Sequence, residues 1–93
     1  MKRVTEKDLQ AIVDRINRMT NSPMAPYTRG DDGYLHAQIG NYSLSFAYGG
    51  VSLIRMVNPG GGVSDVLMSG HVPKRELQTA MFAFMRGMES VQS

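Results

Sequence analysis

The sequence predicts a two-layer α+β domain in which two helices pack on one face of an antiparallel meander sheet, in the order α-β-β-β-(β)-α. Three observations predict this fold. Apolar residues recur at helical spacing near both ends of the chain, they alternate with polar residues between positions 34 and 57, and two glycine-containing dipeptides divide that alternating region. A chain of 93 residues supplies apolar side chains for one core, so we expect a single domain spanning residues 1–93.

Residues 5–19 have the pattern of an amphipathic helix. Thr5 is placed to cap the first turn, and Asp8 occupies the reciprocal capping-box position. The helix is expected to bury one narrow stripe, made of Leu9, Ile12, Val13, Ile16 and Met19. Pro23 cannot continue the helix, so residues 20–33 are expected to form a loop.

Three strands are predicted in the middle of the chain, at Tyr34–Ile39, Tyr42–Tyr48 and Val51–Val57. Gly40-Asn41 and Gly49-Gly50 supply the positive φ angles that two-residue hairpins need, so the three strands form a meander. The expected core face carries Leu35, Ala37, Ile39, Tyr42, Leu44, Phe46, Tyr48, Val51, Leu53 and Val57. The opposite face carries Tyr34, His36, Gln38, Ser43, Ser45, Ala47, Ser52, Ile54 and Met56.

Arg55 conflicts with this register, because the register points its charge toward the core. An inward charge can protect an edge strand from wrong pairing, and it can also reach Asp65 or Glu76 as an ion pair. Alternatively, a bulge at the second turn directs Ile54 and Met56 inward instead.

The rest of the chain predicts a loop, a short strand and a second helix. Asn58–Ser64 is expected to be a flexible loop, and Asp65–Met68 to be a fourth strand at the sheet edge. Pro73 is expected to open the helix at its first position, and Gly87 and the polar end Glu89–Ser93 to mark fraying. The buried stripe of this helix is Leu77, Ala80, Met81, Phe84 and Met88, with Met85 at its flank.

Both helical stripes must cover the same apolar sheet face, so one shared core is expected. Its predicted members are Leu9, Ile16, Phe46, Leu53, Met81 and Phe84. If Phe46 is a core residue, its replacement by Ala destabilises the fold by about 3–5 kcal/mol.

Composition excludes several classes of function. The absence of Cys removes disulfides, thiolate zinc sites and cysteine nucleophiles, and the net charge of +2 is a weak argument for a polyanionic partner. No apolar run approaches the ~20 residues of a membrane span, and the N-terminus lacks the apolar core of a signal peptide. We therefore expect a soluble, cytoplasmic protein that does not act on membranes.

The polar residues do not form a recognisable catalytic or metal-binding pattern. His36 and His71 are far apart in the sequence and have no carboxylate at helical spacing beside them. The serines lack a His and an acid at the spacing of a known hydrolase family. We expect no enzymatic activity, no metal and no cofactor.

Apolar side chains without a place in the predicted core indicate a protein-binding surface. Phe82 lies about 140° from Leu77 around the second helix, among the surface residues Arg75 and Arg86. Ile54, Met56 and Tyr34 likewise fall on the polar face of the sheet. The favoured function is a small non-enzymatic protein-binding module. The simplest partner for Phe82 is a second copy of the chain in a homodimer.

An alternative function is binding of a nucleic acid or a phosphate. The candidate anion-binding residues are Arg55, the loop glycines Gly60, Gly61 and Gly62, and the basic pair Lys74 and Arg75 at the start of the second helix. The element order resembles that of the double-stranded-RNA-binding domain, whose last helix begins with basic residues. That similarity concerns the fold alone.

A second resemblance covers residues 47–87. It includes Ala47-Tyr48-Gly49-Gly50, Arg55-Met56, Gly60-Gly61-Gly62, Asp65-Val66-Leu67 and Lys74-Arg75-Glu76-Leu77. This pattern resembles small accessory proteins of unassigned function encoded by temperate phages and prophages. The resemblance implies a bacterial cytoplasm and a partner that is a host or defence protein. It assigns no functional residue.

Overall fold

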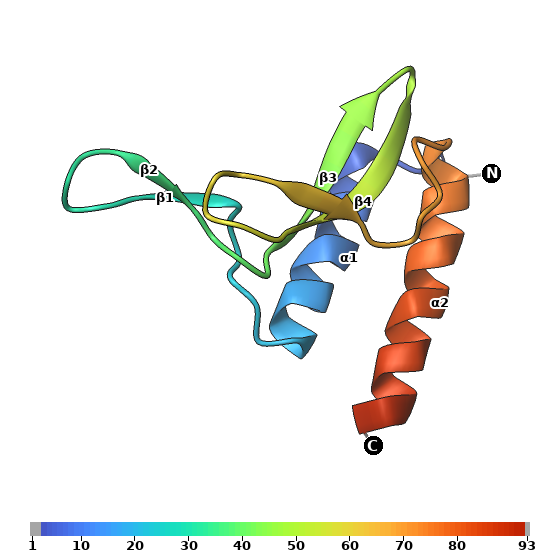
Figure 1. The fold of residues 1–93 in the computed structure, drawn as a ribbon. Helices are drawn as coiled ribbons and strands as arrows, with labels where there is room; N and C mark the ends of the chain where they lie inside the picture. Colours follow the sequence, from blue (N-terminus) through green and yellow to red (C-terminus); the bar gives the residue numbers. More distant parts are fainter. Residues whose placement is uncertain (1–2, 93) are drawn as a thin grey trace.

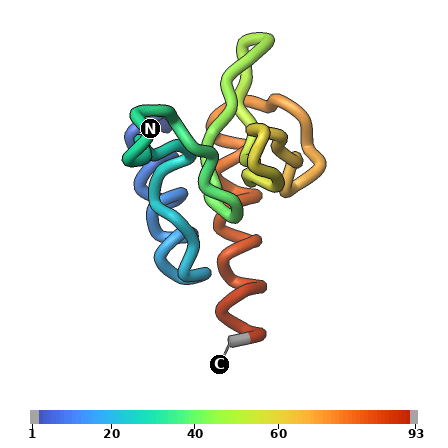
Figure 2. Tube along the Cα trace, turned by 60° about the vertical axis from the view of Figure 1, so that its left-hand side comes forward, coloured from blue at the N-terminus to red at the C-terminus, as the bar shows by residue number. Residues whose placement is uncertain are grey.

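A computed structural model describes residues 3–92 and confirms the α+β class. The elements are α1 (Glu6–Met19), β1 (Tyr27–Arg29), β2 (Leu35–Ala37), β3 (Tyr42–Ala47), β4 (Gly50–Met56), β5 (Val63–Asp65) and α2 (Lys74–Gln92). Strands β3, β4 and β5 form one antiparallel sheet in that order, and β1 and β2 form a separate two-stranded sheet. The two helices run side by side in the same direction (Figures 1 and 2).

The first helix forms as the sequence predicts. The Thr5 side chain accepts a hydrogen bond from the Asp8 amide, and the Asp8 carboxylate accepts one from the Thr5 amide, at 3.1 and 3.0 Å. This reciprocal pair satisfies two amides that no helical carbonyl can reach. The capping box therefore fixes where α1 begins, and the helix ends at Met19.

The predicted meander of residues 34–57 is wrong in its first strand. Leu35–Ala37 does not join β3 but pairs with β1, which lies in the segment 20–33 expected to be a loop. The two short strands form an arm that extends away from the helices (Figure 1). The reason lies at Gly40-Asn41, because the Gly40 amide donates to the Met56 carbonyl and Asn41 is buried. Residues 38–41 do form a turn, closed by the Asn41 amide and the Gln38 carbonyl, but the backbone groups of Gly40 and Asn41 bond to Met56, so the strand before the turn is left outside the sheet.

The hairpin between β3 and β4 forms, with its turn one residue earlier than expected. Ala47 pairs with Gly50, so the turn residues are Tyr48 and Gly49, with φ values of 54° and 73°. Two positive φ angles are what a right-handed hairpin needs. The pairing continues without interruption to Tyr42 and Arg55, so the bulge considered for this hairpin is absent.

Arg55 lies on the helix-facing side of the sheet but is exposed. Its guanidinium stands 4.9 Å from the centre of the Tyr42 ring, and its Nε donates to the Gly40 carbonyl at 3.3 Å. Its partners are therefore an aromatic ring and a backbone oxygen. The alternative ion pairs with Asp65 and Glu76 are not among the salt bridges of the described residues.

One core lies between the helices and the sheet. Its buried members are Leu9, Ile12, Val13, Ile16, Tyr42, Val51, Leu53, Leu77, Met81 and Met85, and Phe84 packs partly against them. The core prediction is thus confirmed for Leu9, Ile16, Leu53 and Met81. Phe46 does not belong to it, since its side chain is 49% exposed. The face prediction is also wrong for Leu35, Ile39, Tyr48 and Val57, which are exposed.

These residues are exposed for different reasons. Tyr48 lies in the turn of the hairpin, whose tip extends past both helices (Figure 1). Phe46 lies on the outer strand β3 and is half-exposed, whereas Val51, directly opposite it on the central strand β4, is buried. The prediction places Leu35 and Ile39 in the main sheet, whereas Leu35 lies in β2, which pairs with β1, and Ile39 lies in the turn after β2. A register predicts which side of a sheet a residue faces, but another layer must cover that side before the residue is buried.

The edge strand and second helix differ slightly from their predicted bounds. β5 is Val63–Asp65, so it begins two residues before the expected strand Asp65–Met68. The Pro73 carbonyl accepts the first helical hydrogen bond, from the Leu77 amide, so α2 begins at Lys74. The helix continues through Gly87 to Gln92, beyond the point where the sequence predicts fraying to begin, and Ser93 lies outside the described residues.

Candidate functional site

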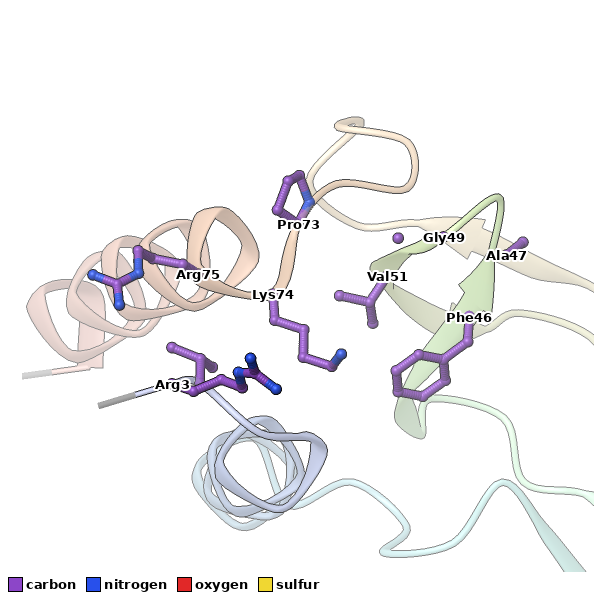
Figure 3. Close-up of a pocket in the computed structure, with 10 residues that line it drawn as sticks. Arg3, Phe46, Ala47, Gly49, Val51, Pro73, Lys74 and Arg75 are labelled. Carbon is purple, nitrogen blue, oxygen red and sulfur yellow. The ribbon is translucent and has the colours of Figure 1, made fainter. Parts of the chain in front are cut away.

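An open cavity of about 750 Å³ lies where three parts of the chain meet. They are the segment before α1, the tip of the β3–β4 hairpin and the start of α2 (Figure 3). Val51 and Val72 exchange two backbone hydrogen bonds, of 2.8 and 3.0 Å, and so tie the chain before α2 to β4. This pairing holds the first turn of α2 beside the hairpin.

The cavity is positively charged. The described residues that line it include Arg3, Lys74 and Arg75 and no acidic side chain. The Arg3 guanidinium and the Lys74 amine point into the same space, whereas Arg75 points to the outer side of α2 (Figure 3). Two cations therefore converge from segments that are some seventy positions apart in the sequence.

Phe46 forms an apolar wall of this cavity. Its ring points toward the space that Lys74 and Arg3 border (Figure 3). Sequence reasoning assigned Phe46 to the core and did not assign Arg3 to any site. The alternation that places Phe46 on the helix side is visible in the sequence, but its exposure depends on its place on the outer strand, since Val51 opposite it on β4 is buried.

The predicted anion-binding set is divided by the structure. Lys74 and Arg75 lie at the cavity, near the first residues of β4, whereas Arg55 and the glycine loop lie at the other end of that strand. The loop also satisfies its own amides, because Gly61 donates to the Asn58 carbonyl and Gly62 to the Asn58 side chain. The loop glycines Gly60, Gly61 and Gly62 therefore do not join the basic pair in one site.

The predicted protein-interface residues are also dispersed. Met56 is only 3% exposed and Ile54 is half-buried, so neither is the exposed surface residue that was expected. Tyr34 is exposed but belongs to the β1–β2 arm. On α2, Phe82 is 39% exposed and Arg86 and Arg75 are exposed. The homodimer contact through Phe82 stays a prediction.

The outer edge of β3 is a feature that sequence reasoning missed. The backbone N–H and carbonyl of Tyr42 point away from β4 and toward Asn17. The N–H donates to Asn17 Oδ1 at 2.8 Å, and the carbonyl accepts from Asn17 Nδ2 at 3.0 Å. Asn17 is buried on α1 and occupies the place of a neighbouring strand. Beyond Tyr42 the edge continues through Leu44 and Phe46, and β3 has no further strand beside it in the described chain.

The histidines lie in two separate hydrogen-bonded pairs. His36 Nε2 lies 2.9 Å from an Asp32 carboxylate oxygen in the β1–β2 arm, and this hydrogen bond, with one from the Tyr34 amide, lowers the pKa of Asp32. His71 Nε2 lies 3.2 Å from Ser45 Oγ. Within residues 3–92 no group of three or more His, Cys, Asp or Glu residues is placed to hold a metal ion.

Comparison of the chain with protein-family models, curated proteins and solved structures finds no match. No helix among the described residues is both long and apolar enough to cross a membrane.

Proposed function

We propose that this chain is a non-enzymatic protein-binding module that accepts an extended strand of a partner protein along the outer edge of β3. In keeping with its resemblance to small phage accessory proteins, the partner is a host or defence protein of a bacterial cytoplasm. The observation that carries the proposal is the row of outward backbone groups on β3.

The hydrogen-bond pattern supports this function. In an antiparallel pair, opposed residues alternate between those that exchange hydrogen bonds and those that do not. Val51, opposite Phe46, exchanges both of its hydrogen bonds with Val72, so the Phe46 N–H and carbonyl point away from β4. Leu44 lies between Phe46 and Tyr42 at the strand period of two and presents its backbone in the same direction.

The composition of β3 also supports strand addition. Exposed edge strands are commonly protected by lysine, proline or a bulge, and the segment Tyr42–Ala47 contains neither a charged residue nor proline. Asn17 covers the edge at Tyr42. An extended partner strand would satisfy the remaining groups and cover part of the exposed Phe46 ring.

Two variants of one residue test this function. Phe46→Pro removes the outward N–H, and it leaves the hydrogen bonds to β4 intact because that N–H does not face β4. Phe46→Thr removes the ring but keeps the N–H and a strand-forming side chain. The tagged chain is used to capture proteins from the cell that encodes it. We expect a captured partner to be retained by Phe46→Thr and lost with Phe46→Pro.

Hydrogen exchange locates the contact. In a complex with the captured partner, the amides of Leu44 and Phe46 should exchange more slowly than in the free chain, while the amide of Ser64 in β5 should be unchanged. Full retention of the partner by Phe46→Pro, or unchanged exchange at Leu44 and Phe46 in the complex, would show that the partner binds elsewhere.

A further inference from the structure

The cationic cavity, which is separate from the outward backbone groups of β3, combines two kinds of binding group. Arg3 and Lys74 place positive charge in it, and no acidic side chain is among the described lining residues. Lys74 is also the first residue of α2, where the helix dipole disfavours a cation and favours an anion. An anion between Arg3 and Lys74 would offset both the mutual repulsion of the cations and the dipole.

The Phe46 ring supplies the second group. A half-exposed aromatic ring beside two cations offers a flat apolar surface as well as charge (Figure 3). Bare phosphate would leave this ring unused, and a purely apolar ligand would leave the cations unpaired. A ligand that uses both carries a phosphate joined to a flat ring, and bases stack on such aromatic side chains in proteins that bind single-stranded nucleic acids.

We propose that this cavity binds a nucleotide, with the phosphate between Arg3 and Lys74 and the base against Phe46. Its volume of about 750 Å³ lies within the range of small-ligand sites, about 300–1,000 Å³. The nucleotide can be free or part of a single strand, because both present the same phosphate and base. This binding does not depend on strand addition to β3.

Gly50, which also lines the cavity, has a structural role. A Cβ atom at this position would lie 2.9 Å from the backbone of His71 and Val72. Glycine is therefore required where the hairpin meets the chain before α2. It holds the Phe46 wall of the cavity close to the Lys74 wall.

Titration with matched probes tests the ligand class. The probes are adenosine monophosphate, adenosine, inorganic phosphate and a labelled single-stranded oligothymidylate, each measured at ~50 mM salt, where electrostatic binding is strong. We expect the monophosphate to bind at least about tenfold more tightly than adenosine or phosphate, because only it engages both groups. An oligothymidylate that binds far more tightly than the monophosphate identifies a single strand as the source, and equal affinities identify a free nucleotide.

Three variants assign the contacts. Phe46→Leu keeps an apolar side chain and the backbone N–H but removes the flat ring, and should weaken nucleotide binding about tenfold. Lys74→Gln should weaken it about tenfold and lower the salt dependence of strand binding by about one phosphate contact. Arg86→Gln removes the same charge from α2 outside the cavity and should leave affinity within about twofold.

Several results would overturn the nucleotide site. They are no binding of the monophosphate or the single strand by the wild-type chain at this salt, equal losses in Lys74→Gln and Arg86→Gln, or full affinity in Phe46→Leu. Tighter binding of an oligoglutamate peptide than of the nucleotide probes would instead identify an acidic protein segment as the occupant. Because Phe46→Leu and Lys74→Gln keep the outward N–H of β3, failure here is distinguishable from failure of strand addition.

Discussion

The side chain of Asn17 is joined to the backbone of Tyr42 by two buried hydrogen bonds, one to the N–H and one to the carbonyl. This pair connects α1 to the end of β3 in the manner of an additional strand. It also limits the free part of the β3 edge, since the backbone groups of Tyr42 are already satisfied.

Replacing Asn17 by Ala should strongly destabilise the fold. Both Tyr42 backbone groups would lose their partner in a buried place, and each unsatisfied group costs about 1–3 kcal/mol. We expect a loss of about 2–4 kcal/mol in the free energy of unfolding, measured by urea denaturation. Gln10→Ala, on the exposed side of α1, is the control and should change stability little. A loss below about 0.5 kcal/mol for Asn17→Ala would mean that water replaces the amide.

Phe46 and Leu53 should respond very differently to truncation, although both lie on the helix-facing side of the sheet. Leu53 is fully buried, so Leu53→Ala should destabilise the chain by about 2–5 kcal/mol. Phe46 is half-exposed, so Phe46→Ala should lower the free energy of unfolding by about 1.5 kcal/mol or less in the same denaturation experiment. Equal losses at the two positions would place Phe46 back in the core.

Substitution by Ala should have opposite effects on stability at Gly50 and at Gly87. Gly50→Ala brings a methyl group against the backbone of His71 and Val72, and such overpacking costs about 1–3 kcal/mol. Gly87 lies inside α2 with open space around its Cβ position, so Gly87→Ala should stabilise the chain by about 0.5–1 kcal/mol. Thermal melts compare the melting temperature of each variant with that of the wild type. A higher melting temperature for Gly50→Ala would contradict the close packing at this position.

The order of the β1–β2 arm should depend on pH through Asp32. Its pKa is lowered from the ordinary 3.8, chiefly by the hydrogen bond with His36 and also by the Tyr34 amide. A lowered pKa in the folded arm means that the carboxylate form stabilises it above pH 3.8, and that this contribution is lost as the pH falls through the lowered pKa.

Hydrogen exchange of the arm amides, compared between neutral pH and acid after correction for intrinsic rates, measures this dependence. Asp32→Asn cannot ionise and should weaken the arm at neutral pH while removing the acid-dependent step. An acid transition of the same size in Asp32→Asn would assign the dependence to another group.

The sequence determined those features that depend on neighbouring residues. The capping box of Thr5 and Asp8 fixed the start of α1, and the spacing of Leu77 and Met81 fixed the buried side of α2. The turn chemistry around Gly49 specified the β3–β4 hairpin to within one residue. These features follow from local hydrogen bonding and side-chain periodicity, so an α+β fold with its principal core residues could be predicted.

Only the tertiary structure decided which apolar surfaces are covered and which distant charges meet. Leu35 is exposed because its strand pairs with β1 and not with β3, and Phe46 is exposed on the outer strand β3, whereas Val51 opposite it on β4 is buried. Arg3 and Lys74 converge because the Val51–Val72 pairing brings the start of α2 to the hairpin, close to the residues before α1. Strand order and strand pairing set these relationships, and neither is determined by the local pattern around any one of these residues.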